Sequence, residues 1–200
     1  MIKAVIFDIG GVVVDFSNDE DYYPYLARVS GASVKRIKGI VEGRLWTKLD
    51  KDQISQKAFD RILARKLGIE QKQVLWYETY VRTGRLNGKV IAIARRLSRK
   101  YEVAYLSNVD LSRYTYTEKL MKPYAKIFSH EFASCCIHLR KPDKSVFTYV
   151  LAKMKVKPRE AVFIDNQEEN VEGARRAGLK GVLFKGSDDL EKQLRKLGVL

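Results

Sequence analysis

Strand-like and helix-like segments alternate along most of this chain, and this alternation limits the fold it can adopt. Five short segments are rich in β-branched and aromatic residues: Ile2–Phe7, Glu102–Leu106, Ile127–Phe132, Ala161–Ile164 and Gly181–Phe184. Apolar residues at helical spacing lie between the later segments, for example at Val146, Val150 and Met154. Because strands that alternate with helices form parallel sheets with right-handed crossovers, the pattern predicts an α/β fold.

The stretch from about Phe16 to Arg85 follows a different pattern, with helical periodicity and no convincing strand. Two sets of apolar residues recur there at helical spacing: Val34, Ile37 and Val41, and Ile54, Ala58 and Ile62. We therefore predict an all-helical insertion at residues 16–85, which divides a core made of residues 1–15 and 86–200. Since the insertion begins soon after the first strand, we expect it to lie above the mouth of the sheet.

Composition limits the class of protein and the partners. The 200 residues are 46% hydrophobic, enough for a real core, and the formal net charge is +14. Such a charge attracts anionic partners: phosphorylated metabolites, nucleic acid or a membrane surface. The Lys and Arg residues are scattered among Asp and Glu without a long basic block, which favours small anions over nucleic acid.

The cysteines and the apolar runs bear on disulfides, metal sites and the cellular location. Cys135 and Cys136 are adjacent, so they indicate neither a disulfide framework nor a zinc site, which needs separated pairs. Asp8 interrupts the opening apolar run too early for a signal peptide, and no apolar stretch is long enough to span a bilayer. We predict a cytoplasmic protein without a membrane partner; its oligomeric state is left open.

Polar residues stand where predicted strands end. Asp8 follows the first strand, Ser107 and Asn108 follow the second, and Asp165 closes the fourth. Ligands of open α/β sheets bind at the carboxyl ends of the strands, and a carboxylate there can act as a nucleophile. Lys141 precedes Pro142 near a helix start, against the helix dipole, which favours a role in binding negative charge. Taken alone, Asp8 and the pair Ser107 and Asn108 also fit ordinary turn chemistry, and lysines are common in loops.

Oxygen donors gather after the fourth strand. Asp165 is followed by Asn166 and, a turn later, by Glu168 and Glu169. Oxygen ligands from one or two carboxylates are typical of Mg²⁺ sites, which predicts a role for Asp165 there. Glu168 fits an acidic helix start stabilised by the dipole.

Together these motifs resemble the haloacid dehalogenase-like hydrolase superfamily over nearly the full chain. Four segments are similar to its motifs, in the right order: Val5–Val12, Leu106–Asn108, Arg140–Asp143 and Phe163–Asn166. Residues 46–59 are similar to a recurrent stretch of the family's helical cap. The resemblance implies a Rossmann-like three-layer core with a parallel sheet, an inserted helical cap and Mg²⁺-dependent hydrolysis of a small phosphorylated substrate.

The resemblance also implies roles for individual residues. Asp8 would be the nucleophile and a metal ligand, with the backbone carbonyl of Gly10 as a second ligand. Asp165 would bind the metal, and Glu169 would support it through water. Ser107 and Asn108 would hold the phosphoryl group. Lys141 would balance the charge of Asp8 and of the phosphate.

Two positions depart from the family pattern. Gly10 stands where most phosphatases of the superfamily carry a second Asp, which acts as general acid and base; a branch that resembles sugar-phosphate phosphatases also carries glycine there. Loss of such a proton donor typically slows a reaction by about 10² to 10⁴. Asp15 is a candidate substitute. Asn166 replaces a second acid and contributes no charge.

Two alternatives to the phosphatase stay open. One is a metal-independent haloacid dehalogenase, in which Asp8 attacks carbon; the acidic residues Asp165 and Glu169 argue against it. The other is a non-catalytic relative that binds phosphorylated ligands or nucleic acid through its basic surface. Salt-dependent binding of nucleic acid without turnover would distinguish it.

Overall fold

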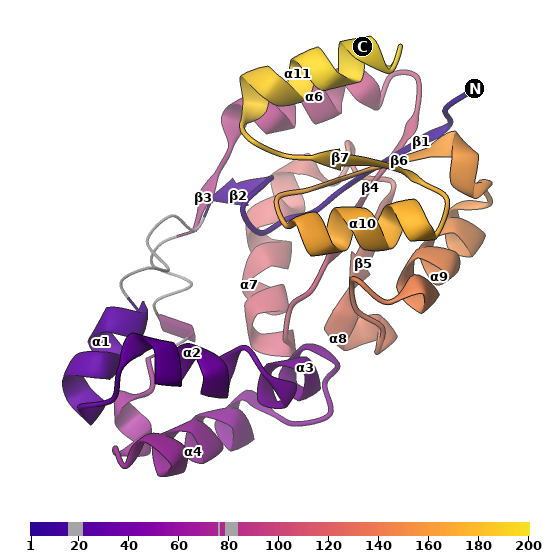
Figure 1. The fold of residues 1–200 in the computed structure, drawn as a ribbon. Coiled ribbons are helices and arrows are strands. Elements are labelled where there is room, and N and C mark those ends of the chain that lie inside the picture. The colour runs from indigo at the N-terminus through magenta and orange to yellow at the C-terminus, as the bar shows by residue number, and fades with distance from the viewer. Residues whose placement is uncertain (16–21, 76, 79–83) are drawn as a thin grey trace.

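A five-stranded parallel sheet forms the centre of the protein in a computed structural model that describes residues 1–15, 22–75, 77–78 and 84–200 (Figure 1). The strands run in the order β5-β4-β1-β6-β7. Their bounds are Ala4–Phe7 (β1), Glu102–Ser107 (β4), His130–Ala133 (β5), Ala161–Asp165 (β6) and Lys180–Leu183 (β7). The chain therefore builds outward from β1 in one direction and then returns to its other side, as in Rossmann-like folds.

Helices cover both faces of the sheet and form a three-layer core. On one face, Val5, Phe7 and Tyr105 pack with α6 (Gly88–Leu97), α7 (Leu111–Met121) and α11 (Ser187–Lys196). On the other, Ile6 and Phe163 pack with α9 (Lys144–Met154) and α10 (Glu168–Arg176). Strands buried on both faces are expected to be continuously apolar, as β1 is. The predicted α/β, Rossmann-like fold class is confirmed.

Local details differ from the sequence prediction. The third predicted strand, Ile127–Phe132, begins only at His130 and continues to Ala133. Phe128 instead makes T-shaped ring contacts with Phe7 and Tyr105, at centroid distances of 6.3 and 5.7 Å. Residue types that favour strands therefore led to a wrong strand prediction for Phe128, which packs against one face of the sheet.

A short antiparallel pair was not predicted. It joins β2 (Val14–Asp15) to β3 (Arg85–Leu86). Two-residue strands are too short to show an alternating pattern. The pair brings both ends of the predicted insertion together, and Arg85, the last residue of that all-helical prediction, is in a strand.

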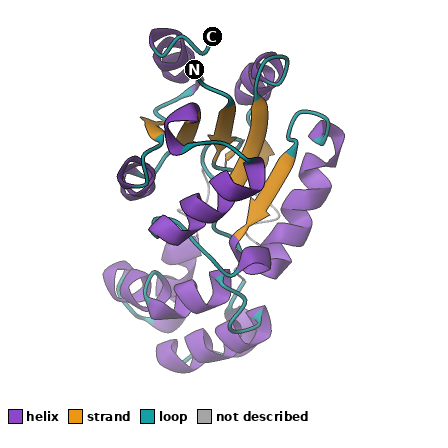
Figure 2. Ribbon diagram, turned by 90° about the vertical axis from the view of Figure 1, so that its right-hand side faces the viewer, coloured by secondary structure: helices purple, strands orange, loops and turns teal. Residues whose placement is uncertain are grey.

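Among the described residues between β2 and β3, the helices α1 to α4 form what we call the helical insertion (Figure 1 and Figure 2). Their bounds are Tyr22–Ser30 (α1), Val34–Val41 (α2), Arg44–Asp50 (α3) and Gln56–Leu67 (α4). Ser33 and Ser55 cap α2 and α4, and Gly68 ends α4 with a left-handed φ of 68°. The predicted start at Phe16 lies outside the described residues.

The helical insertion has a hydrophobic core of its own. Tyr22, Leu26, Ile37, Phe59 and Leu63 are among its buried members. Other described elements include α8 (Ser134–Ile137) and short 3-10 helices at Gln71–Gln73, Lys122–Tyr124 and Pro158–Glu160. Within the described ranges, none of the helices has both the length and the apolar character needed to cross a membrane.

Candidate active site

Two carboxylates lie side by side where the strand order reverses. Phe7 of β1 pairs with Ile164 of β6, so Asp8 and Asp165 follow at the same edge. The Asp8 amide donates to the carbonyl of Ile164 at 2.8 Å, which extends the pairing by one residue. In open α/β sheets this crevice is where ligands bind.

Lys141 joins the two carboxylates. Its Nζ lies 2.6 Å from Oδ1 of Asp8 and 2.8 Å from Oδ2 of Asp165, and its side chain is 1% exposed. A buried ammonium group is tolerated when charged partners and hydrogen bonds compensate for the lost hydration. The predicted site residues Asp8, Lys141 and Asp165 therefore lie within direct contact.

Burial and charge shift the ionisation of this group. Burial is the main cause that raises the pKa of Asp8 to about 7; Asp165 adds to the shift and Lys141 opposes it. Burial alone would lower the pKa of Lys141, but Asp165 and Asp8 together raise it above its usual value. The two carboxylates therefore favour the charged form of the lysine.

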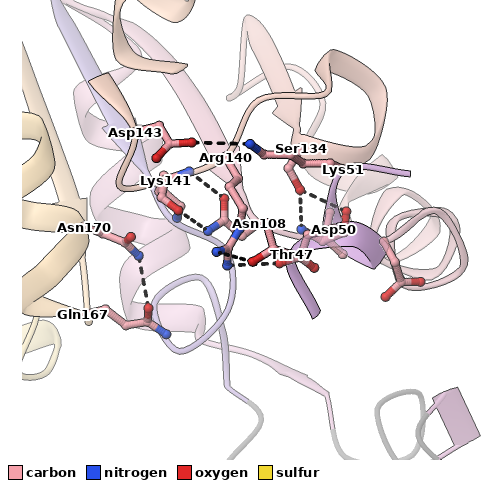
Figure 3. A network of polar contacts seen from close by, with 12 residues as sticks. Thr47, Asp50, Lys51, Asn108, Ser134, Arg140, Lys141, Asp143, Gln167 and Asn170 are labelled. Atoms are coloured by element: carbon pink, nitrogen blue, oxygen red, sulfur yellow. Dashed lines mark hydrogen bonds and ion pairs between the residues drawn. The ribbon is translucent and has the colours of Figure 1, made fainter. Parts of the chain in front are cut away.

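Asn108 holds the backbone of Lys141. Its side-chain Nδ2 donates to the Lys141 carbonyl at 3.0 Å, and its Oδ1 accepts from the Lys141 amide at 2.9 Å (Figure 3). Both ends of the amide side chain are thus engaged by the backbone of Lys141. Ser107, also buried, ends β4 next to β1.

Asp165 has further donors. Its Oδ1 accepts from the amide of Gln167 at 2.8 Å, and its Oδ2 accepts from Nδ2 of Asn170 at 3.1 Å. Asn170 also donates to the side chain of Gln167 at 3.2 Å (Figure 3). No role for Asn170 was predicted from the sequence; the available signal was a lone amide one helical turn after Asn166, on the side of α10 that is buried.

Glu169 is placed differently from its neighbour. Its side chain is exposed in the first turn of α10, and among the described residues no hydrogen bond or ion pair joins it to Asp8, Lys141 or Asp165. Its predicted support of a metal through water stays a prediction.

The loop after β1 turns tightly beside Asn166. The amides of Val12, Val13 and Val14 all point to the carbonyl of Ile9. Gly11 has a φ of 78°, and a Cβ at this position would collide with the side-chain amide of Asn166. Asn166 therefore lies against this glycine turn. Asp15, the candidate proton donor, is exposed in β2 opposite Arg85.

The donor set fits Mg²⁺. Two adjacent carboxylates, with the carbonyl of Gly10 nearby in the chain, are hard oxygen ligands that leave other positions for water and phosphate. In the described parts of the chain, no three His, Cys, Asp or Glu side chains cluster as a closed all-protein metal site would require.

Comparison with known proteins agrees with the geometry. The family model of haloacid dehalogenase-like hydrolases matches residues 2–178. Drimenol cyclase drtB of Aspergillus calidoustus is 24% identical over 98% of this chain, which spans 37% of that protein. Flavin mononucleotide hydrolase 1 of Arabidopsis thaliana is 25% identical over 99% of this chain and 78% of its own length.

A solved structure agrees in fold. A HAD family enzyme from Bacteroides thetaiotaomicron, in complex with magnesium and inorganic phosphate, superposes with a TM-score of 0.75 at 20% identity. The match covers 92% of this chain and 95% of that one. Since the family model covers most of the sequence and the fold agrees, the chain belongs to the haloacid dehalogenase-like hydrolases.

Proposed function

We propose that this hydrolase is a Mg²⁺-dependent phosphatase, which hydrolyses a small phosphorylated metabolite through an aspartyl-phosphate on Asp8. The observation that carries the proposal is Lys141, whose ammonium group touches both Asp8 and Asp165. A carboxylate nucleophile beside a fixed cation suits a substrate that brings negative charge to the same place.

The chemistry has two steps. The carboxylate of Asp8 attacks phosphorus, an Oδ–P bond forms, and the ester P–O bond breaks; the departing oxygen takes a proton from solvent water and leaves as an alcohol. Water then attacks the phosphorus, the Oδ–P bond breaks, and inorganic phosphate and the Asp8 carboxylate result. Lys141 balances charge on the transferring oxygens in both steps.

The phosphoryl group would be held by groups at the end of β4. The Ser107 hydroxyl and the backbone N–H of Asn108 are the donors that we assign to it, together with Lys141. The side chain of Asn108 would act indirectly, because it fixes the Lys141 backbone.

Asp8, the carbonyl of Gly10 and Asp165 would hold Mg²⁺, with Glu169 acting through water. When bound, the ion supplies positive charge that polarises the phosphoryl oxygens. Asn170 would keep Asp165 oriented for this role.

The comparisons support a phosphate ester as the substrate class. One relative is named a flavin mononucleotide hydrolase, and one similar structure holds magnesium with inorganic phosphate. We further propose that residues 16–85 form a cap domain over a core of residues 1–15 and 86–200, which selects the substrate. A cytoplasmic location stays a prediction from the sequence.

A phosphatase screen over sugar phosphates and nucleotides tests the proposal. We expect phosphate release that requires Mg²⁺, stops with a chelator and falls by at least about 10³-fold in Asp8→Asn. A thermal melt of the variant checks that it is folded. Activity that survives the chelator or the substitution would refute the mechanism.

Two further assays address the alternatives. Halide release from 2-haloacids without Mg²⁺ would show that the protein is a dehalogenase and not a phosphatase. Salt-dependent binding of nucleic acid with no turnover of any ester would show that the protein is a non-catalytic binding protein.

A further inference from the structure

One carboxylate of the helical insertion lies buried between two arginines of the core. Asp50, the last residue of α3, is 0% exposed. Its Oδ1 accepts from Nη2 of Arg113 at 3.1 Å, and its Oδ2 accepts from Nη2 of Arg140 at 3.2 Å. Burial raises the pKa of Asp50, and the two arginines oppose this shift.

The end of α3 holds the segment around Lys141 at several points. Arg140, directly before Lys141, also donates from Nη1 to Oγ1 of Thr47 at 3.4 Å. Lys51 pairs with Asp143 at 3.4 Å, and its carbonyl lies 3.0 Å from Nδ1 of His138. Figure 3 shows Arg140 and Asp143 directed toward Thr47, Asp50 and Lys51 from the Lys141 segment.

The opposite side of this segment is held by the core. Asn108 fixes both backbone polar groups of Lys141. A shift of the Arg140 backbone is passed on to the backbone of Lys141, because consecutive residues share a planar peptide bond. The ammonium of Lys141 lies within 3 Å of both Asp8 and Asp165, so a small backbone shift changes both contacts.

We propose that Asp50 is a positioning residue that acts through Arg140 on Lys141. The insertion thereby takes part in assembling the site rather than only covering it. The inference rests on the proposed function in one respect, the catalytic role of Lys141.

Arg113 offers an internal control. It contacts the same carboxylate and its side chain is more deeply buried than that of Arg140, 7% against 23% exposed, but it extends from α7 and not from the Lys141 segment. Its Nε pairs with Asp110, and its guanidinium lies 4.5 Å from the centroid of the Trp46 ring. The loop that leads to α7 also keeps its own anchor, because Ser134 Oγ bonds the amide of Val109 at 2.9 Å.

The test compares Arg140→Gln with Arg113→Gln. Each variant leaves Asp50 with one arginine, so both should lower the melting temperature. We expect Arg140→Gln to lower kcat about 10-fold with a smaller change in KM, since misplacement of a catalytic group affects the reacting geometry. Arg113→Gln should keep kcat within about 2-fold, a range set by the additivity of independent sites. Equal losses of kcat would overturn the proposal.

Non-additivity is the second part of the test. Asp50→Asn should lower kcat as Arg140→Gln does, and the double variant should lose no more than the worse single variant, within about 2-fold. Multiplied losses would contradict action through Arg140. If Asp50→Asn does not fold, the comparison of the two arginine variants still decides.

Hydrogen exchange separates this inference from the proposed function. Amides of residues 138–146 should exchange about 10-fold faster in Arg140→Gln than in Arg113→Gln, with no substrate needed. If this difference in exchange is found but the protein has no phosphatase activity, the positioning role of Asp50 is supported and the proposed phosphatase function is refuted. If the exchange rates do not differ but the protein is an active phosphatase, the positioning role is refuted and the proposed function is supported.

Discussion

At the residue scale, the site depends on charge compensation in a place closed to water. Asp8, Lys141 and Asp165 are all buried, and removal of one partner from such a group typically costs about 3–5 kcal/mol. Substitutions of these three residues therefore mix effects on stability with effects on chemistry. Asn170 is more informative, because it orients Asp165 without carrying charge.

Asn170→Ala removes the side-chain donor to Oδ2 of Asp165. We expect the affinity for Mg²⁺ to fall by about 10- to 100-fold, the usual effect of losing a group that orients a metal ligand. Calorimetric titration of the metal-free protein with Mg²⁺ measures it.

Glu169→Gln, one residue away on the same helix, tests the proposed water-mediated support separately. Its exposed side chain should change the affinity less than Asn170→Ala does. A larger effect at Glu169 would assign the main support of the metal to that residue, through water.

At the element scale, close packing of α10 and α8 against loops sets the shape of the site. A Cβ on Gly173 of α10 would lie 2.6 Å from the carbonyl oxygen of Pro142, so this helix touches the backbone that follows Lys141. Ser134, the first residue of α8, bonds both the amide and the carbonyl of Val109 at 2.9 and 3.2 Å. Both contacts place loops that carry polar site residues.

Gly173→Ala and Gly39→Ala should have opposite effects on stability. Both glycines lie inside helices, but a Cβ on Gly39 meets no atom within 4 Å. We expect Gly39→Ala to raise the free energy of unfolding by about 0.5–1 kcal/mol, and Gly173→Ala to lower it by about 1–3 kcal/mol through overpacking. Urea unfolding measures both, and a stabilised Gly173→Ala would contradict the close contact.

Ser134→Ala leaves the buried amide of Val109 without its side-chain acceptor. The free energy of unfolding should fall by about 1–3 kcal/mol. Ser129→Ala is the control, since the Ser129 hydroxyl bonds Glu102 at an exposed position, 2.6 Å away. If both variants unfold at the same denaturant concentration, the Ser134 contact does not contribute as we describe.

At the scale of the whole molecule, the sheet and the helical insertion have separate hydrophobic cores joined by a charged interface. Leu63 belongs to the insertion core and Leu97 to the core on one face of the sheet. The interface between them contains Asp50, Arg113 and Arg140. Polar interfaces of this kind permit one part to open before the other.

Leu63→Ala should therefore unfold the insertion first. The substitution costs about 2–5 kcal/mol at a buried leucine. The two tryptophans, Trp46 and Trp76, both belong to residues 16–85, so fluorescence reports on that region. We expect the fluorescence of Leu63→Ala to change at a lower urea concentration than its circular dichroism. Leu97→Ala should instead shift the circular dichroism transition. Coincident transitions in Leu63→Ala would mean that the interface keeps both cores cooperative.

The sequence alone determined the fold class and most of the polar residues at the sheet edge. An apolar run such as Ala4–Phe7 predicts a strand that is buried on both faces of the sheet. This prediction needs only the residues of that strand. Parallel strands all present their carboxyl ends at one edge, so Asp8, Ser107 and Asp165 had to lie there once the alternation was recognised.

Only the tertiary structure decided how side chains pair. Phe128 packs beneath Phe7, the side chain of Asn108 holds Lys141, and Asn170 supports Asp165. Asp50 and Arg140 are 90 residues apart in the chain. Local periodicity records which residues are buried, but a pairing over such a separation depends on the packing of whole elements, which no short pattern contains.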